Sequence, residues 1–312
     1  MKRFLLASSA LVAFSGAAAA DVALSGRAEM GIFDSDAVAG AQFFTDIDVT
    51  FTMSGETDNG LTFGASVDLD EGGAVSSATQ DNSDDGGATI FISGAFGTVT
   101  MGDTDGALDW ALTEAGNVGN PGSLADDETS HAGYNGSYLD GGNDGQILRW
   151  DYSAGDFGAA ISVEDDNGAG EVGYAVGLRY NIDLSGTTIA LGIGHQEAAS
   201  AVPGVTASAT GVSATATLAS GVAVGVVYTD MDDSPFDSHI GVGIGYTTGA
   251  FSIHANYGEF DGVVAANDQD GFGLAAAYDL GGGAVVHFGY GSGSVGAGPD
   301  FDTWSFGLGL SF

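Results

Sequence analysis

The stretch DIDVTFTMSGETDNGLTFGASVDLD, residues 46–70, contains the pattern that decides the fold. In Asp46–Met53 apolar residues occupy every odd position and polar residues every even position, and Leu61–Asp70 alternates in the same way. Because successive side chains of a strand point to opposite faces, each half predicts a strand with one apolar and one polar face. The residues between them, Gly55–Gly60, have the composition of a tight hairpin turn.

The same alternation recurs along the chain, for example in Val172–Ile182, and no helical periodicity is apparent after residue 20. Tight, turn-like connectors alternate with longer, mostly acidic ones, which predicts sixteen strands. The tight connectors are Gly55–Gly60, Gly94–Gly97, Ala154–Asp156, Asp183–Gly186, Ala219–Gly221, Thr248–Ala250 and Asp279–Gly283. The longer connectors lie near residues 34–42, 71–87, 104–145, 164–171, 198–208, 231–237, 259–270 and 292–301.

An even number of strands joined by alternating short turns and long loops is typical of a transmembrane β-barrel. A soluble barrel would turn its apolar faces inward, but sixteen strands enclose more space than side chains can fill. We therefore predict an all-β fold, a transmembrane antiparallel β-barrel of 16 strands with apolar faces outward. Aromatic residues near strand ends are candidates for interfacial girdles: Trp150, Tyr152, Tyr228, Tyr278 and Tyr290.

The N-terminus predicts an export signal. Lys2 and Arg3 precede an apolar run, Phe4–Phe14, and Ala18–Ala20 form a small-residue cleavage site. We expect residues 1–20 to be removed as a signal peptide, leaving residues 21–312 as a single barrel domain.

Acidity dominates the composition. The formal net charge of −37 would become −39 after loss of Lys2 and Arg3, leaving only Arg27, Arg149 and Arg179 as fixed cations. A basic surface for nucleic acid or anionic lipid is therefore excluded. The absence of cysteine excludes disulfides and thiolate metal sites.

The longest interval without strand alternation is residues 104–145. It carries eight acids and no Lys or Arg: Asp105, Asp109, Glu114, Asp126, Asp127, Glu128, Asp140 and Asp144. A loop of this length in a compact domain is usually functional or disordered. We expect it to narrow a water-filled pore.

Three segments resemble the sixteen-stranded general-diffusion porins of alphaproteobacterial outer membranes. They are VTFTMSGETDNGLTFGAS at 49–66, IFISGAFGTVTMGD at 90–103 and YSAG at 152–155. The final strand, which alternates from Thr303 to Phe312 and ends in Phe, extends the resemblance across the chain. The resemblance implies a cell outer membrane location, a homotrimer, and a long third loop folded into the lumen, where its acids oppose a basic wall.

By this resemblance Asp103 ends the fifth strand and residues 104–145 form the constriction loop. Alternation places the wall residues inward: Arg27, Asp46, Asp48, Asp68, Asp70, Arg149, Asp151 and Arg179. With three arginines the basic wall would be weak, and acid-lined pores favour cations. We expect passive diffusion of cations and small hydrophilic solutes. A substrate-specific channel, or a plugged barrel with a structural or adhesive role, is the alternative.

Close-spaced loop acids also offer oxygen ligands to Ca²⁺, although none forms an EF-hand: Asp81, Asp84, Asp85, Glu164, Asp165 and Asp166. Divalent ions could bridge such loops to lipopolysaccharide phosphates, so lipid and lipopolysaccharide are expected partners. No cofactor is required, and no catalytic motif points to an enzyme. The five histidines lack metal-ligand spacing, but His131 could tune conductance through its titration.

Overall fold

The computed structural model describes residues 21–36, 40–70, 87–124, 131–134, 146–165, 172–200 and 204–312, although not the side chain of Asp70. The predicted signal peptide, residues 1–20, lies outside these ranges. Sixteen strands follow the chain in order. They are β1 (Asp21–Ser35), β2 (Gln42–Glu56), β3 (Thr62–Asp70), β4 (Ala88–Gly94), β5 (Gly97–Gly102), β6 (Ile147–Ala154), β7 (Phe157–Asp165), β8 (Val172–Asp183), β9 (Thr187–Ala199), β10 (Thr206–Leu218), β11 (Val222–Asp232), β12 (Phe236–Thr248), β13 (Phe251–Gly262), β14 (Gln269–Gly281), β15 (Ala284–Val295) and β16 (Phe301–Ser311).

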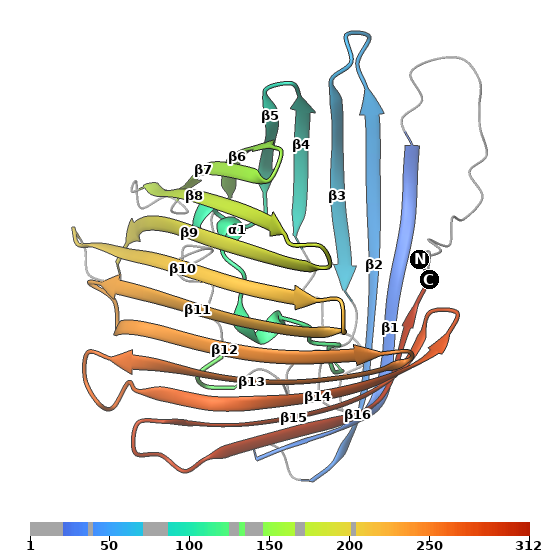
Figure 1. The fold of residues 1–312 in the computed structure, drawn as a ribbon, viewed down its shortest axis with the longest axis vertical. Coiled ribbons are helices and arrows are strands. Elements are labelled where there is room, and N and C mark those ends of the chain that lie inside the picture. The colour runs from blue at the N-terminus through green and yellow to red at the C-terminus, as the bar shows by residue number, and fades with distance from the viewer. Residues whose placement is uncertain are drawn as a thin grey trace.

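Every strand pairs with its sequence neighbours, and β1 also pairs antiparallel with β16, which closes the barrel (Figure 1). The closing register runs from Arg27 opposite Ser311 to Ser35 opposite Thr303. The predicted sixteen strands and all seven tight connectors are confirmed. Glycines with positive φ, such as Gly155 and Gly249 at +62° each, let the chain reverse within these turns.

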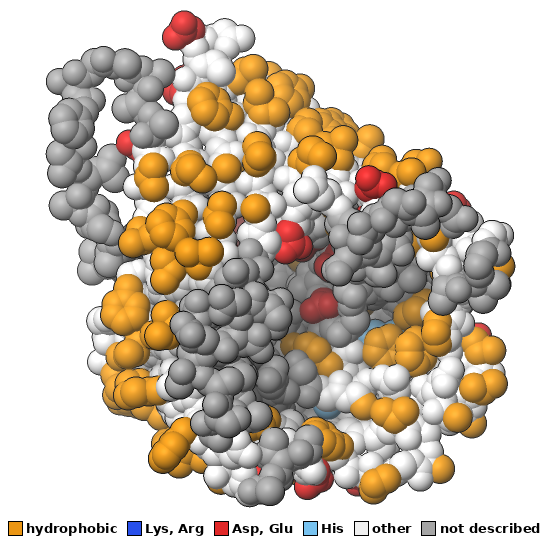
Figure 2. Space-filling model, turned by 180° about the vertical axis from the view of Figure 1, so that it is seen from behind, with side chains coloured by type: hydrophobic (Ala, Val, Ile, Leu, Met, Phe, Trp, Pro, Cys, Tyr) orange, Lys and Arg blue, Asp and Glu red, His pale blue; other side chains and the backbone are white. Residues whose placement is uncertain are grey.

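Apolar side chains point outward, as the alternation predicted. Phe43 is 78% exposed and Ile90 66%, values that a water-soluble surface would not repeat on strand after strand. Figure 2 shows hydrophobic side chains spread over the outer surface. Such a surface is matched to lipid.

Aromatic side chains mark both edges of the apolar surface. Toward the long loops, Phe272 and Tyr290 pack with ring centroids 5.9 Å apart, and Tyr290 pairs with Trp304 in the strand register. Toward the tight turns, Phe251 pairs with Tyr278. These rows have the placement of the interfacial girdles of outer-membrane barrels.

Two short helices lie in the predicted loop, where no helical periodicity was expected: α1 (Ala107–Ala111) and the 3₁₀ turn η1 (Ala115–Asn117). Elements of five and three residues are too short to display a helical repeat in the sequence, so the absence of helical periodicity did not reveal them. Neither is long and apolar enough to cross a membrane, and the same holds for every helix among the described residues.

The buried hydrophobic cluster lies inside the ring. It joins loop residues to inward-facing wall residues of β7, β8, β10 and β11: Ala107, Leu108, Leu112, Ala115, Ala160, Ala175, Ala209, Val227 and Met231. This core exists because a loop enters the barrel and covers part of its inner face.

Orientation of the strands generates a stability prediction. Ile47 of β2 is 50% exposed on the apolar face, whereas Thr52 lies on the opposite, lumenal face. Ile47→Arg should destabilise the barrel by about 2–4 kcal/mol because the charge would enter the hydrocarbon region. Denaturant unfolding in lipid vesicles measures this. Thr52→Arg, the matched control, should change stability far less; equal losses would contradict the orientation.

Candidate constriction site

The loop enters the lumen directly after β5, and Asp103 follows the strand end at Gly102. α1 packs against β7, β8 and β9, and η1 against β11, β12 and β13 (Figure 1). Leu108 of α1 is fully buried at this contact. The described loop segments therefore lie along the inner wall of the barrel.

Wall hydroxyls bond backbone donors of the loop. The Ala107 N–H donates to Ser162 Oγ at 2.8 Å, and the Thr113 N–H donates to Ser213 Oγ at 2.9 Å. The Ala107 amide belongs to the first residue of α1, where an N–H has no partner within the helix, and Thr113 follows the C-cap Leu112 in the chain. The wall serines thus bond donors that burial would otherwise leave unpaired.

Inward-facing glycines let the loop backbone approach the wall. A Cβ atom added at any of five glycines would collide with backbone atoms of the loop: Gly177, Gly192, Gly243, Gly245 and Gly258. They lie on β8, β9, β12 and β13, along the course of the loop. We call these five residues the glycine track.

Three wall histidines donate to loop carbonyls. His254 Nδ1 lies 3.1 Å from Val118 O, His287 Nδ1 lies 3.0 Å from Gly122 O, and His239 Nε2 lies 3.2 Å from Gly133 O. Since a carbonyl only accepts, each ring nitrogen must carry a proton. These contacts join β12, β13 and β15 to the loop.

Acids line the exposed side of the loop. The Asp105 side chain is 64% exposed, Asp109 and Glu114 are half-buried, and Glu114 Oε2 accepts from Asn117 Nδ2 at 2.9 Å. The other predicted loop acids lie outside the described residues: Asp126, Asp127, Glu128, Asp140 and Asp144.

A second acidic group lies on β2 and β3, away from the strands that α1 and η1 contact. Asp46 and Asp48 share the inward face of β2, and Thr50 Oγ1 donates to Asp68 Oδ1 at 2.8 Å. The backbone register places Asp70 opposite Asp48. The wall facing the lumen here is acidic.

Arg27 stands opposite Asp48 in the register and forms an ion pair with Glu29, whose side chain is buried. Glu29 was missing from the predicted lumenal residues. The signal was available, because Glu29 lies two positions after Arg27 and so shares its face of β1. This acid neutralises the cation that the register places opposite Asp48.

The other two arginines hold the base of the loop. Arg149 Nη1 donates to Asp105 O at 2.7 Å, and its Nε lies 3.4 Å from Asp151 Oδ1. The guanidinium of Arg179 lies 3.7 Å above the Trp110 ring of α1, a stacked cation–π contact. Both arginines face inward as predicted. They lie on the loop's side of the lumen, so they do not form a basic wall opposite it.

The predicted calcium ligands are only partly placed. Glu164 and Asp165 are successive residues of β7, and Glu164 is buried on the inner face while Asp165 points outward. These two carboxylates therefore do not converge on one ion. Asp81, Asp84, Asp85 and Asp166 lie outside the described residues. Across the described ranges, no three acids, histidines or cysteines are grouped to hold a metal.

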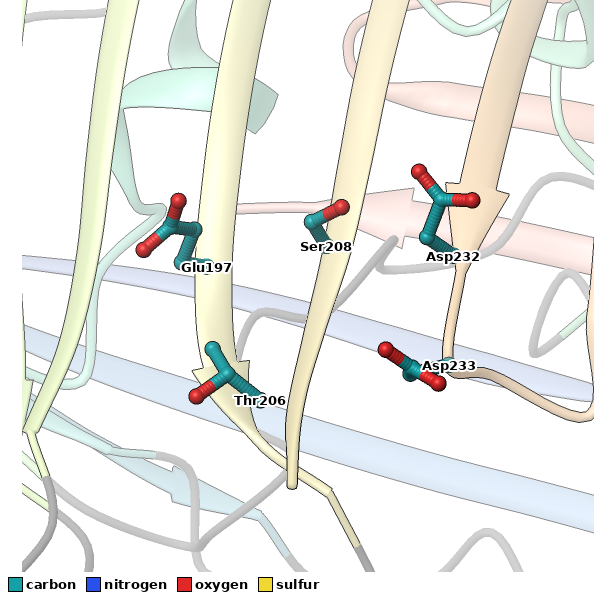
Figure 3. Close-up of a pocket in the computed structure, with 5 residues that line it drawn as sticks. All are labelled: Glu197, Thr206, Ser208, Asp232 and Asp233. Atoms are coloured by element: carbon teal, nitrogen blue, oxygen red, sulfur yellow. The ribbon is translucent and has the colours of Figure 1, made fainter. Parts of the chain in front are cut away.

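An acidic pocket lies on the outer face, at the long-loop ends of β9 to β11 (Figure 3). Glu197 comes from β9, Asp232 from the end of β11, and Asp233 follows directly. Thr206 and Ser208 of β10 complete the lining. This pocket would face the outer leaflet and is separate from the lumen.

The glycine track generates a packing prediction. Gly243→Val would place a side chain against the Ala115 carbonyl. It should cost about 1–3 kcal/mol through overpacking and push η1 toward the lumen, which lowers single-channel conductance. Denaturant unfolding and bilayer recording test both effects. Ser66→Val, on the inner face of β3, is the control; if Gly243→Val behaved like it, the close contact would be refuted.

Comparison with known proteins agrees with this geometry. A family model described as Gram-negative porin matches residues 7–297. A porin of Rhodobacter capsulatus is 31% identical over 302 residues, covering 85% of this chain and 92% of that protein.

Solved structures give the same result. The structure of a porin superposes with a TM-score of 0.70 at 25% identity, covering 94% of this chain and all of that one. A substituted porin of Rh. blastica, at a TM-score of 0.69 and 17% identity, shares the fold over the same 94%. Together with the closed barrel and its inward loop, these matches show that the chain belongs to the Gram-negative porin family, whose members form channels in the outer membrane.

Proposed function

We propose that this porin is an open, cation-selective channel through which ions and small hydrophilic solutes diffuse passively, without catalysis. One observation carries the proposal: acids line both the loop and the wall of β2 and β3, while the cations near them are engaged. Arg27 pairs with Glu29, Arg149 with Asp105 and Asp151, and Arg179 stacks on Trp110.

Electrostatics turns this arrangement into selectivity. A wall of carboxylates raises the local concentration of cations and repels anions, and rings of acids favour cation passage. The net charge of −37 gives the surrounding protein the same sign. The described loop segments lie against the wall, which supports an open lumen over a plugged one.

The proposal also includes removal of a signal peptide during export and assembly into a homotrimer. Cleavage after Ala20 would deliver a mature chain that begins at Asp21. The outer apolar surface could meet lipid or a neighbouring barrel, and we propose a homotrimer on the family pattern. We also propose that acids of the long loops bind Ca²⁺ that bridges to lipopolysaccharide phosphates.

Neutralising the β2–β3 acids tests the selectivity. The variant Asp46→Asn/Asp48→Asn/Asp68→Asn should move the reversal potential in a KCl gradient toward zero, because three lumenal charges are lost. Planar-bilayer recording measures this shift. Asp58→Asn, in the exposed turn after β2, is the control and should leave it unchanged. Wild-type preference for anions would refute the proposal.

A further inference from the structure

A chain of hydrogen bonds links two separate segments of the loop to β13. His131 Nε2 lies 2.7 Å from Asn256 Oδ1, Asn256 Nδ2 lies 3.2 Å from His254 Nε2, and His254 Nδ1 lies 3.1 Å from Val118 O. Asn256 and His254 are both buried. The chain thus runs from loop residue 131 through the wall to loop residue 118.

The protons of this chain have one consistent arrangement. Val118 O only accepts, so His254 Nδ1 carries its hydrogen, and Nε2 of a neutral ring is free to accept from the Asn256 amide. Asn256 Oδ1 then accepts from His131 Nε2–H. A proton on His254 Nε2 would face the Asn256 Nδ2 amide, which is itself a donor, so this hydrogen bond would be lost. The chain therefore requires a neutral His254.

His131 and His239 add a second constraint. His239 Nε2 donates to Gly133 O at 3.2 Å, two residues from His131. Within the described part of the chain, Nδ1 of each ring is buried without a hydrogen-bond partner. Adding a proton there would create a buried N–H with no acceptor, which is costly. If both rings were charged they would also repel each other across the loop–wall contact.

The groups around His131 and His239 do little to stabilise an added proton on either ring. Tyr134 meets the His131 ring edge-on at 5.6 Å, and Phe260 lies on His239 with ring centroids 4.1 Å apart. Among the described charged groups, Asp270 of β14 acts on His131. Burial lowers the pKa of His131 below its ordinary value of 6.5, and the Asn256 hydrogen bond and Asp270 offset this only in part.

Proton binding is linked to attachment of the loop segment, and this linkage gives the direction in which pH changes the attachment. A loop segment detached into water would carry His131 with an ordinary pKa of about 6.5. Below that pH the detached state binds a proton that the attached state resists. Attachment is therefore strongest above about pH 6.5 and weakens as the pH falls through the lowered pKa of the attached state.

We propose that His131, His239, His254 and Asn256 are positioning residues that hold the 131–134 segment against the wall only while the histidines are neutral, so that acid releases it into the lumen and narrows the pore. This pH-dependent attachment goes beyond the proposed cation selectivity, because it sets the width of the pore.

Bilayer recording between pH 7.5 and pH 5 tests the proposal, since carboxylates with ordinary pKa values near 4 stay mostly charged there. The wild-type ratio of open to closed time should fall, by up to about tenfold for each histidine whose pKa is lowered by one unit. His131→Gln/His239→Gln keeps an N–H donor at each site without titration, so it should close less than wild type at pH 5, with His254 as the one remaining titrating residue of the four.

His195→Gln is the matched control. His195 lies on the outer face, where its ring contacts Thr210 and Glu197 and not the loop. This variant should keep the wild-type pH response. A wild-type channel with constant open time over this range, or a double variant that closes like wild type, would overturn the proposal.

Cysteine labelling gives a readout that does not depend on the double variant folding. The chain has no cysteine, so Ala132→Cys reports the segment and Asp58→Cys reports an exposed turn. The maleimide labelling rate of position 132, divided by that of position 58, should rise from pH 7.5 to pH 5. An unchanged ratio would mean that acid does not release the segment.

Discussion

Closure of the sheet is the constraint on which the rest of the structure depends. In a bilayer core no water satisfies an exposed N–H or C=O, so a strand structure is viable only if it has no edge. Pairing of β1 with β16 removes the last edge. Closure fixes the alternation of faces on every strand at once, with apolar side chains toward lipid and polar or small ones toward the lumen. A one-residue slip in any register would reverse those faces.

Because the barrel is closed and its apolar faces point outward, the packed core lies inside the barrel, between the loop and the wall. Barrel walls of sixteen strands cannot fill their interior with side chains, and here the loop supplies the missing partner. Leu108 and Leu112 pack on alanines and valine of the wall, while glycines allow backbone-to-backbone approach. Packing, wall hydroxyls and histidines hold one side of the loop against the wall. The carboxylates on its other side can then face the lumen, so the same fold that stabilises the loop also sets the field of the pore.

Much of this architecture is readable from the sequence, because it depends on local patterns. The two-residue period of Asp46–Met53 and the glycines of the tight turns specify strands, turns and faces without distant information. The inward positions of Arg149 and Arg179 follow from the same parity. The place of the loop came from resemblance to a family. Its contacts were not predictable, since His254 meets Val118 across 136 positions of sequence and His287 meets Gly122 across 165. Glu29 was a miss that parity alone could have prevented.

Single-channel current through the wild-type protein tests the central account most directly. The mature chain, refolded and recorded in a planar bilayer under a KCl gradient, should show stepwise conductance with a reversal potential of cation sign. That outcome requires both an open lumen and a field set by its carboxylates. Silence from correctly folded barrels would mean that the loop blocks the lumen, and a reversal potential of anion sign would mean that the arginines outweigh the acids.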